Sequence, residues 1–201
     1  MTDLGLHQAG MKDAARIGSI TGRAFADDPI NLWILHKPAL ITRFMTQLAR
    51  GIYLPYGFCE YLDGDQGATM WLPAGVKADM SLGTTLAMLK DAILCGVPGA
   101  LQRGTAFSAI MNAVKPREPH FYLFTIGVVP EAQGKGLGGA LLRSGLARAD
   151  AAGMPTYLES SKWANVPIYQ RYGFELRDEP DLPDGCPPMY PMWRPVGGGR
   201  G

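Results

Sequence analysis

The stretch LFTIGVVPEAQGKGLGGALL, residues 123–142, limits the fold more than any other part of the chain. Its apolar run ends at a proline, and four glycines then occur within six positions around one lysine. This pattern predicts a buried strand, a glycine-rich turn and a helix. A helix N-terminus offers unpaired N–H groups and about half a positive charge, and glycines let a phosphate approach them closely. The stretch therefore predicts a phosphate-binding turn.

A simple tight connection between strand and helix would need only one or two glycines, so the cluster favours a binding role. The pattern of the P-loop, G-x-x-x-x-G-K-[ST], is not met. Gly136 follows Lys135 where serine or threonine is required, and Val129 stands where the first glycine should be. A nucleoside triphosphate site of that kind is excluded.

The dinucleotide fingerprint G-x-G-x-x-G does match Gly134, Gly136 and Gly139, and Glu159 follows about 20 residues later, where a ribose partner is expected. However, residues 130–133 separate the apolar run from the first glycine, whereas the fingerprint should follow its strand almost at once. Only about 60 residues remain after Gly139, too few for a long doubly wound sheet. A dinucleotide-dependent oxidoreductase is therefore the weaker alternative.

The remaining chain mixes helical and strand periods. Helices are predicted over residues 11–25, 40–52, 82–94, 100–114 and 136–152, with a loop at 27–29 and a short helix between Asn165 and Gly173. Strands are predicted at FCEYL, ATMWL, HFYLFTIGVV, TYLES, FELRDE and PPMYPMWRP. The first two strands flank Asp63-Gly64-Asp65 and should form a hairpin, the last two a second hairpin. The strand-helix-strand unit at 121–160 should hold parallel strands.

Two motifs carry a family resemblance. The pattern V-x-P-x-x-Q-G-x-G-x-G, from Val128 to Gly138, resembles the acyl-CoA pyrophosphate loop of the GNAT superfamily of acetyltransferases. NVPIYQRYGFE, residues 165–175, resembles its second signature, an asparagine followed by Y-x-x-x-G-F. Residues 117–195, and AFADDP and ATMWLPAG within 22–76, are similar to the puromycin N-acetyltransferase branch; residues 77–116 show no match in detail.

The resemblance implies an α+β fold: a central mixed, mostly antiparallel sheet with splayed parallel strands, flanked by helices. It also implies a single domain over residues 1–201. In this division, residues 1–117 form the acceptor-side half with an insertion, residues 118–195 bind acetyl-CoA, and residues 196–201 are a flexible tail. The implied activity is transfer of an acetyl group from acetyl-CoA to a primary amine of a small molecule, with puromycin-like aminonucleosides as one candidate.

The resemblance also assigns the residues that bind the cosubstrate. The pantetheine arm would lie along the backbone of Ile126, Gly127 and Val128, whose N–H would also polarise the thioester carbonyl. Main-chain donors of the turn, with the charge of Lys135, would hold the diphosphate; the residues concerned are Gln133, Gly134, Lys135, Gly136, Leu137 and Gly138. Asn165 is either a plain N-cap of the following helix or a cap that also contacts acetyl-CoA. No metal is implied.

Tyr169, the tyrosine of Y-x-x-x-G-F, is implied to be the general acid to the departing thiolate, against the alternative of an ordinary packed aromatic. Glu159 is the candidate base, although strand alternation would equally allow it to face solvent. Glu118 and His120 are weaker candidates, more readily structural. The acceptor side is assigned Phe25, Asp28 and Trp71. Loop capping is the alternative role for Asp28, and core packing is the alternative role for Trp71.

Composition excludes several classes of function. Nineteen Lys+Arg against eighteen Asp+Glu give a net charge of +1, and no long run of like charge suggests nucleic acid or an anionic membrane as partner. No apolar segment has the length of a signal peptide or a membrane span, so a cytoplasmic protein is expected. Cys59, Cys95 and Cys186 are too far apart for a metal motif and are expected to be buried thiols. A homodimer and a non-catalytic acyl-CoA-binding module stay open as alternatives.

Overall fold

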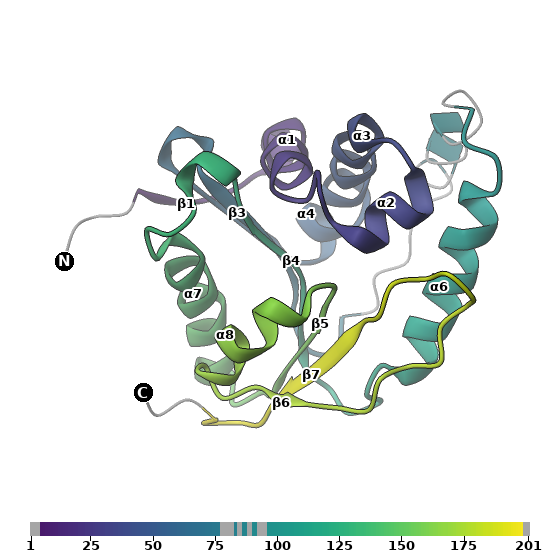
Figure 1. Cartoon of the computed structure of the whole chain (residues 1–201). Helices are drawn as coiled ribbons and strands as arrows, with labels where there is room; N and C mark the ends of the chain where they lie inside the picture. Colours follow the sequence, from purple (N-terminus) through teal and green to yellow (C-terminus); the bar gives the residue numbers. More distant parts are fainter. Residues whose placement is uncertain (1–4, 77–82, 84–85, 88–89, 92–95, 199–201) are drawn as a thin grey trace.

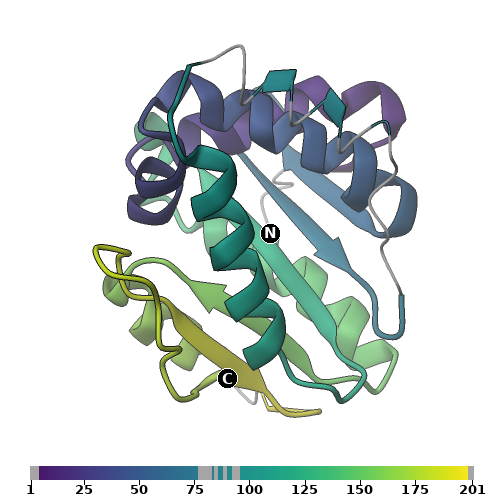
Figure 2. The ribbon, with the colours of Figure 1, turned by 90° about the vertical axis from the view of Figure 1, so that its right-hand side faces the viewer.

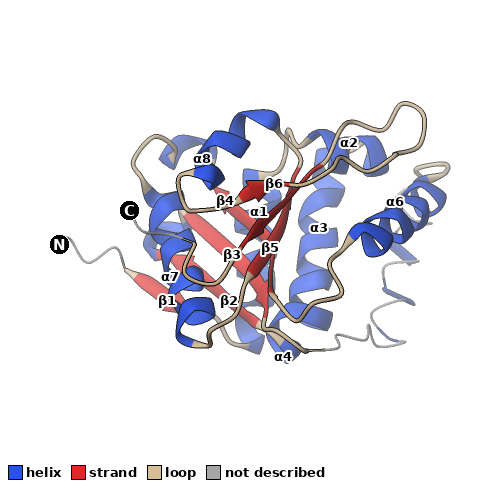
Figure 3. Ribbon diagram, turned by 90° about the horizontal axis from the view of Figure 1, so that it is seen from below, coloured by secondary structure: helices blue, strands red, loops and turns tan. Residues whose placement is uncertain are grey.

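A single sheet organises the chain. The computed structural model describes residues 5–76, 83, 86–87, 90–91 and 96–198. Its strands are β1 Leu6–Gln8, β2 Phe58–Leu62, β3 Gly67–Leu72, β4 Phe121–Val128, β5 Thr156–Ser160, β6 Glu175–Leu176 and β7 Tyr190–Arg194. They form a seven-stranded sheet in the order β1-β2-β3-β4-β5-β7-β6 (Figures 1 and 3). Only β4 and β5 pair in parallel; the other five neighbouring pairs are antiparallel. The predicted α+β class with mostly antiparallel strands is confirmed.

Helices cover both faces of this sheet. They are α1 Ala14–Ala24, α2 Pro29–Leu35, α3 Pro38–Leu48, α4 Leu54–Tyr56, α6 Ala100–Val114, α7 Leu137–Ala151 and α8 Val166–Gln170. Figure 1 shows α1 and α3 on one side and α7 and α8 on the other, and α6 passes in front of the sheet in Figure 2. The arrangement buries apolar side chains of α1, α3 and α7 against the sheet from both sides.

In the described part of the chain, buried apolar side chains form three clusters, of which the third consists of Ile30, Met111 and Met189. Under α1 and α3, the fully buried side chains include Ile17, Ile41 and Met70. Under α7, a second cluster gathers Trp71 with Leu142, Leu146, Leu158 and Phe174. Because successive strand residues point to opposite faces, neighbours Met70 and Trp71 enter different cores. The strand-turn-helix unit predicted at 121–160 is therefore held from both sides.

Most predicted elements are confirmed, including both hairpins and the parallel strand pair. Two elements were missed. The loop predicted at 27–29 is present as a turn at 25–28, but the helix that follows it, α2, was not predicted. Asp28 caps α2 by accepting a 2.9 Å hydrogen bond from the N–H of Asn31, and Pro29 occupies its first turn. β1 was not predicted because its three residues, Leu6–Gln8, are exposed and show no apolar periodicity.

Three further predictions have mixed outcomes. The helix predicted at 82–94 falls mostly outside the described residues, as does Cys95. Cys59 is buried as expected, whereas Cys186 is only half-buried. The helix over 40–52 begins at Pro38 and continues beyond Gly51, as a π-helical turn at Ala49–Tyr53 and then α4. This continuation brings the Tyr53 side chain into the core beside β4.

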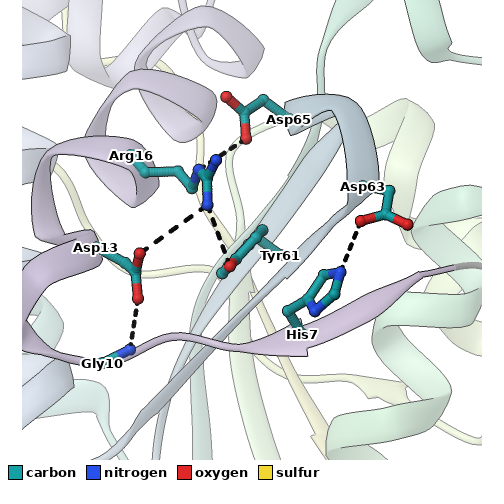
Figure 4. Close-up of polar contacts among 7 residues, drawn as sticks. All are labelled: His7, Gly10, Asp13, Arg16, Tyr61, Asp63 and Asp65. Carbon is teal, nitrogen blue, oxygen red and sulfur yellow. Dashed lines mark hydrogen bonds and ion pairs between the residues drawn. The ribbon is translucent and has the colours of Figure 1, made fainter.

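Charged side chains at the β1 edge form a surface network (Figure 4). The Arg16 guanidinium lies 3.0 Å from the Asp65 carboxylate and donates to the Tyr61 hydroxyl at 3.1 Å, and His7 contacts Asp63 at 2.6 Å. The charged groups are largely exposed, so each pair stabilises the fold by less than about 1 kcal/mol. This network fixes β1 against its neighbours and offers no enclosed site.

The close approach of α7 to the sheet gives a first prediction. A Cβ atom at Gly145 would lie 2.2 Å from the Trp71 ring, whereas one at Gly104 in α6 would lie 3.6 Å from Ile34. Gly145→Ala should therefore lower the free energy of unfolding by about 1–3 kcal/mol through overpacking. Gly104→Ala, the matched control, should raise it by up to about 1 kcal/mol through helix propensity. Urea unfolding checks both; equal effects would contradict this packing.

Candidate active site

The parallel strands β4 and β5 part in the middle of the sheet. They pair at only three positions, from Phe121↔Thr156 to Leu123↔Leu158, while β4 continues to Val128 alongside β3. At the parting point, β3 pairs Met70 with Thr125 and the next residue, Trp71, with Leu123, so Phe124 is an extra residue on β4. Such a bulge bends its strand. The cleft between β4 and β5 follows from this bend.

Side chains from four parts of the chain line a pocket in this cleft. They come from the end of α1, from β4, from β5 with the loop after it, and from α8 and the turn before it. The lining residues are Phe25, Leu123, Phe124, Thr125, Ile126, Leu158, Glu159, Ser160, Ser161, Asn165 and Tyr169. The sequence-based candidates Phe25, Ile126, Glu159, Asn165 and Tyr169 are thus brought together.

The main chain of β4 directs hydrogen-bonding groups toward the cleft. The Val129 N–H donates to the Gln66 carbonyl at 2.9 Å, on the β3 side. Because backbone groups alternate sides along a strand, Val128 and Ile126 direct theirs toward the cleft. The Val128 carbonyl accepts a 3.1 Å hydrogen bond from the Gln133 amide, which ties the glycine-rich turn to the strand. The cleft edge therefore resembles an open sheet edge.

Gly127 has a different reason to be glycine. A Cβ atom there would lie 2.6 Å from the Ala24 Cβ and 3.0 Å from the Phe25 ring. The absence of a side chain lets the end of α1 approach β4, and Phe25 reaches the cleft as a result. Gly127 thus positions the α1 end of the pocket.

The glycine-rich turn presents bare backbone to solvent at the start of α7. Gly134 and Gly136 have φ of 78° and 75°, and a Cβ on either would meet no atom within 4 Å. In the described part of the chain, no group accepts a hydrogen bond from the N–H groups of residues 134–139. Lys135 is exposed beside them, while Leu137 is buried and anchors the first turn. Unpaired donors, a helix N-terminus and open space together fit a diphosphate.

Glu159 lies on the opposite wall, on β5. Its Oε2 accepts a 2.7 Å hydrogen bond from the Tyr122 hydroxyl, while its buried Oε1 has no partner among the described residues. Burial raises the pKa of the Glu159 carboxyl above its usual range, and the charge of Lys115 and the hydroxyls of Tyr122 and Tyr157 act in the opposite direction. The solvent-facing alternative is wrong, and the free oxygen can accept a proton.

Tyr169 approaches the cleft from α8. Its ring packs edge-on against Phe174, with centroids 5.9 Å apart, and the residue lines the pocket. Burial raises the pKa of the Tyr169 phenol to about 12, so the hydroxyl carries its proton at neutral pH. The side chain therefore packs on its neighbours, lines the pocket and is protonated at neutral pH.

Comparison with known proteins agrees with this geometry. Residues 97–193 match the family model of the acetyltransferase (GNAT) domain. Residues 97–193 are therefore similar to a GNAT acetyltransferase domain. An uncharacterized N-acetyltransferase of Schizosaccharomyces pombe, C550.08, is 28% identical over 177 residues, which cover 81% of this chain and 71% of that protein.

Solved structures show the same fold. A Corynebacterium glutamicum protein described as histone acetyltransferase HPA2 and related acetyltransferase has a TM-score of 0.68 at 23% identity, covering 96% of each chain. Arylalkylamine N-acetyltransferase 2 from Aedes aegypti has a TM-score of 0.66 at 12% identity, covering 97% of this chain and 100% of that one. At these identities the likeness establishes the GNAT fold, and the dinucleotide-binding alternative is set aside.

Two sequence-based assignments to the GNAT acceptor side need correction. Trp71 is fully buried beneath α7, so it belongs to the core and lines no pocket. Asp28 is also buried, and its carboxylate accepts hydrogen bonds from Asn31 and from the Ser161 hydroxyl. Asp28 therefore holds the loop after β5, and Ser161 is the residue that reaches the cleft.

The turn before α8 differs from expectation as well. Asn165 occupies the N-cap position of α8, as expected, but it has helical φ and ψ and its side chain makes no capping hydrogen bond. The residue lines the pocket instead. His120 packs edge-on against Tyr157 and Trp193 at 5.5 and 5.7 Å, and its ring nitrogen contacts the Glu118 carbonyl oxygen at 2.6 Å. This pair is structural.

Sequence reasoning missed the neighbours of Glu159. Tyr122 pairs with Tyr157 across the parallel strands, and their rings stack with centroids 6.1 Å apart. The Lys115 ammonium lies 3.4 Å from the centroid of the Tyr122 ring. Pairing the two predicted strands would have placed Tyr122 beside Glu159, but no sequence signal indicates Lys115.

Two further site classes find no support in the described part of the chain. No group of three or more His, Cys, Asp or Glu side chains there could hold a metal ion. None of the helices described is both long and apolar enough to cross a bilayer.

Proposed function

We propose that this chain is an N-acetyltransferase that moves an acetyl group from acetyl-CoA to a primary amine of a small molecule, in the cytoplasm. One observation carries the proposal: Glu159 and Tyr169 line the pocket between β4 and β5, and β4 leads from that pocket to the glycine-rich turn, whose N–H groups have no partner in the described part of the chain. A donor site at the turn and a proton-transfer site in the pocket would thus lie along one strand, as transfer between two bound reactants requires.

The donor end of the cleft would bind acetyl-CoA through main-chain groups. Amides from Gln133 to Gly138 would hold the diphosphate, with Lys135 adding a mobile charge. The cleft-side groups of Ile126 and Val128 would hydrogen-bond the pantetheine arm as an added strand does. The Val128 N–H would stabilise negative charge on the thioester oxygen. Asn165 lies where it can contact the same arm.

The proton-transfer end would act through two side chains. Glu159 Oε1 would take a proton from the ammonium form of the acceptor, which leaves a nucleophilic amine. The amine nitrogen then bonds to the thioester carbonyl carbon, and the carbon–sulfur bond breaks. Tyr169 would donate its proton to the departing thiolate, and the acetylated nitrogen, which still carries one proton too many, would return a proton to the Tyr169 phenolate through solvent. Glu159 would release the proton that it took to solvent. The products are an N-acetyl amine and free CoA.

Aromatic side chains favour an acceptor that carries an aromatic group. Phe25 and Phe124 line the pocket, and Tyr53 stacks on Phe124 with centroids 4.7 Å apart. Such walls stabilise a flat apolar group, while Glu159 attracts the amine. The arylalkylamine named for the Aedes aegypti relative and the resemblance to the puromycin N-acetyltransferase branch point the same way.

A CoA-release assay tests the proposal. Acetyl-CoA is mixed with the protein and a panel of amines: puromycin, arylalkylamines, polyamines and aminoglycosides. We expect release with at least one amine and N-acetylation confirmed by mass spectrometry. Stabilisation by acetyl-CoA without release from any amine would instead indicate an acyl-CoA-binding module. Activity on another amine without activity on puromycin would rule out the assignment to the puromycin N-acetyltransferase branch.

Tyr169→Phe supplies a narrower test. The variant keeps the ring that packs on Phe174 and removes the proton, so kcat should fall about 10–100-fold while the acetyl-CoA Kd stays unchanged. Tyr56→Phe, at an exposed tyrosine, is the matched control and should behave as wild type. Unchanged kcat in Tyr169→Phe would remove the acid role and leave the aromatic packing role.

A further inference from the structure

Lys115 is a half-buried cation that has no role in the proposed reaction steps. It follows α6 directly, its N–H bonds the Met111 carbonyl at 3.1 Å, and the following Pro116 favours its extended conformation, φ −60° and ψ 132°. The end of α6 therefore aims the side chain at the sheet. The ammonium lies 3.4 Å from the centroid of the Tyr122 ring, a cation–π contact.

The contact continues to the candidate base. Tyr122 is held between Lys115 on one side and the stacked Tyr157 ring. Its hydroxyl donates to Glu159 Oε2 at 2.7 Å, so one carboxylate oxygen is fixed while Oε1 stays free. In the described part of the chain Lys115 has no ion pair of its own, and its charge acts on Glu159 across the tyrosine.

We propose that Lys115 is a positioning residue for Glu159: its ammonium group fixes the Tyr122 ring and keeps the Glu159 carboxylate ionised, ready to receive the proton of the acceptor amine. This inference rests on the proposed function, in which Glu159 is the base. Without a nearby cation, burial would shift the Glu159 carboxyl further toward its protonated form, which cannot act as a base.

The other groups around Glu159 cannot supply this charge. Tyr53, Tyr122 and Tyr157 face it from the turn after α3, from β4 and from β5, and burial raises the pKa of each phenol, so all three stay neutral. His120, which lies near Lys115, has a pKa lowered by its own burial and is neutral above its ordinary range. Lys115 is the cation that acts on the carboxylate in the described structure.

The pH profile of kcat/KM tests the inference. Lys115→Met keeps most of the side-chain volume and removes the charge, so the pKa of Glu159 should rise and the acidic limb should move to higher pH by about one unit. The ionisation of the amine substrate is the same for both enzymes, so the difference reports the enzyme's group. Lys115→Arg should restore the wild-type limb. A uniform loss at every pH would mean a merely structural role and would overturn the proposal.

A second measurement does not depend on activity. The chain holds six glutamates, so protein labelled with ¹³C at the glutamate carboxyl gives few signals, and the Glu159 signal is the one absent in Glu159→Gln. Its titration midpoint should rise in Lys115→Met and return in Lys115→Arg. An unchanged midpoint overturns the role of Lys115 even if the enzyme is active. A shifted midpoint in a protein that acetylates no amine supports the electrostatic role while the proposed function fails.

Discussion

Glu159→Gln should lower kcat/KM for the acceptor amine by about 10²–10⁴-fold and leave the Kd of acetyl-CoA unchanged. The amide keeps the size of the side chain and can still accept the hydrogen bond from Tyr122, but it cannot take a proton from an ammonium group. Steady-state kinetics with saturating acetyl-CoA, together with calorimetric titration of the donor, separate the two effects.

Glu118→Gln is the matched control for this experiment. Glu118 is exposed, and its main-chain carbonyl, which the substitution keeps, contacts the His120 ring, so the substitution should change neither quantity. The pH dependence of kcat/KM gives a further test, because its direction can be predicted. Because burial raises the pKa of Glu159, wild-type kcat/KM should fall as pH decreases through that raised value, and the amide variant should lack this limb. Full activity in Glu159→Gln would remove the base from the mechanism.

Gly136→Val should weaken acetyl-CoA binding about 100-fold or more. Gly136 combines a φ of 75° with open space at the start of α7, so a branched side chain would strain the turn and project where the diphosphate is proposed to lie. Losing two charge-assisted hydrogen bonds costs about 3 kcal/mol, which corresponds to about two powers of ten in Kd. Calorimetric titration with CoA measures the loss.

Backbone strain alone could also weaken binding by unfolding the protein, and Gly153→Val controls for that. Gly153 has a φ of 62° and equally open surroundings, but it lies at the opposite end of α7. Both variants should lose comparable stability, while only Gly136→Val should lose the rise in Tm on adding CoA. Equal retention of that rise would show that the turn is not the diphosphate site.

The sequence predicted those parts of the site whose chemistry lies in neighbouring residues. The glycine-rich turn, the parallel unit and the short helix with Tyr169 each depend on local backbone preference and apolar period, and each was confirmed as structure. Their chemical roles stay proposals. For Glu159, strand alternation predicted that it shares a face of β5 with Tyr157, but it could not predict whether that face lies against the protein or in solvent.

The parts that failed depend on contacts between distant segments. Trp71 was assigned to the acceptor wall, but the bulge at Phe124 and the glycine at 145 place its ring under α7. Asp28 was assigned to the same wall, but its carboxylate accepts a hydrogen bond from the Ser161 hydroxyl, 133 residues further along the chain. Lys115 reaches Tyr122 only because of where α6 ends. No local pattern encodes such distances, since they follow from packing of the whole chain.

The position of β7 has a consequence for how the molecule assembles. This strand is synthesised after β6 and yet lies between β5 and β6, so neither neighbour can complete its hydrogen bonds until it has emerged. During synthesis the edge of β5, with Glu159 on it, stays open to association with another nascent chain. Newly made molecules should therefore depend on chaperones most in the interval between β5 and β7, and slowing translation there should lower the yield of native protein.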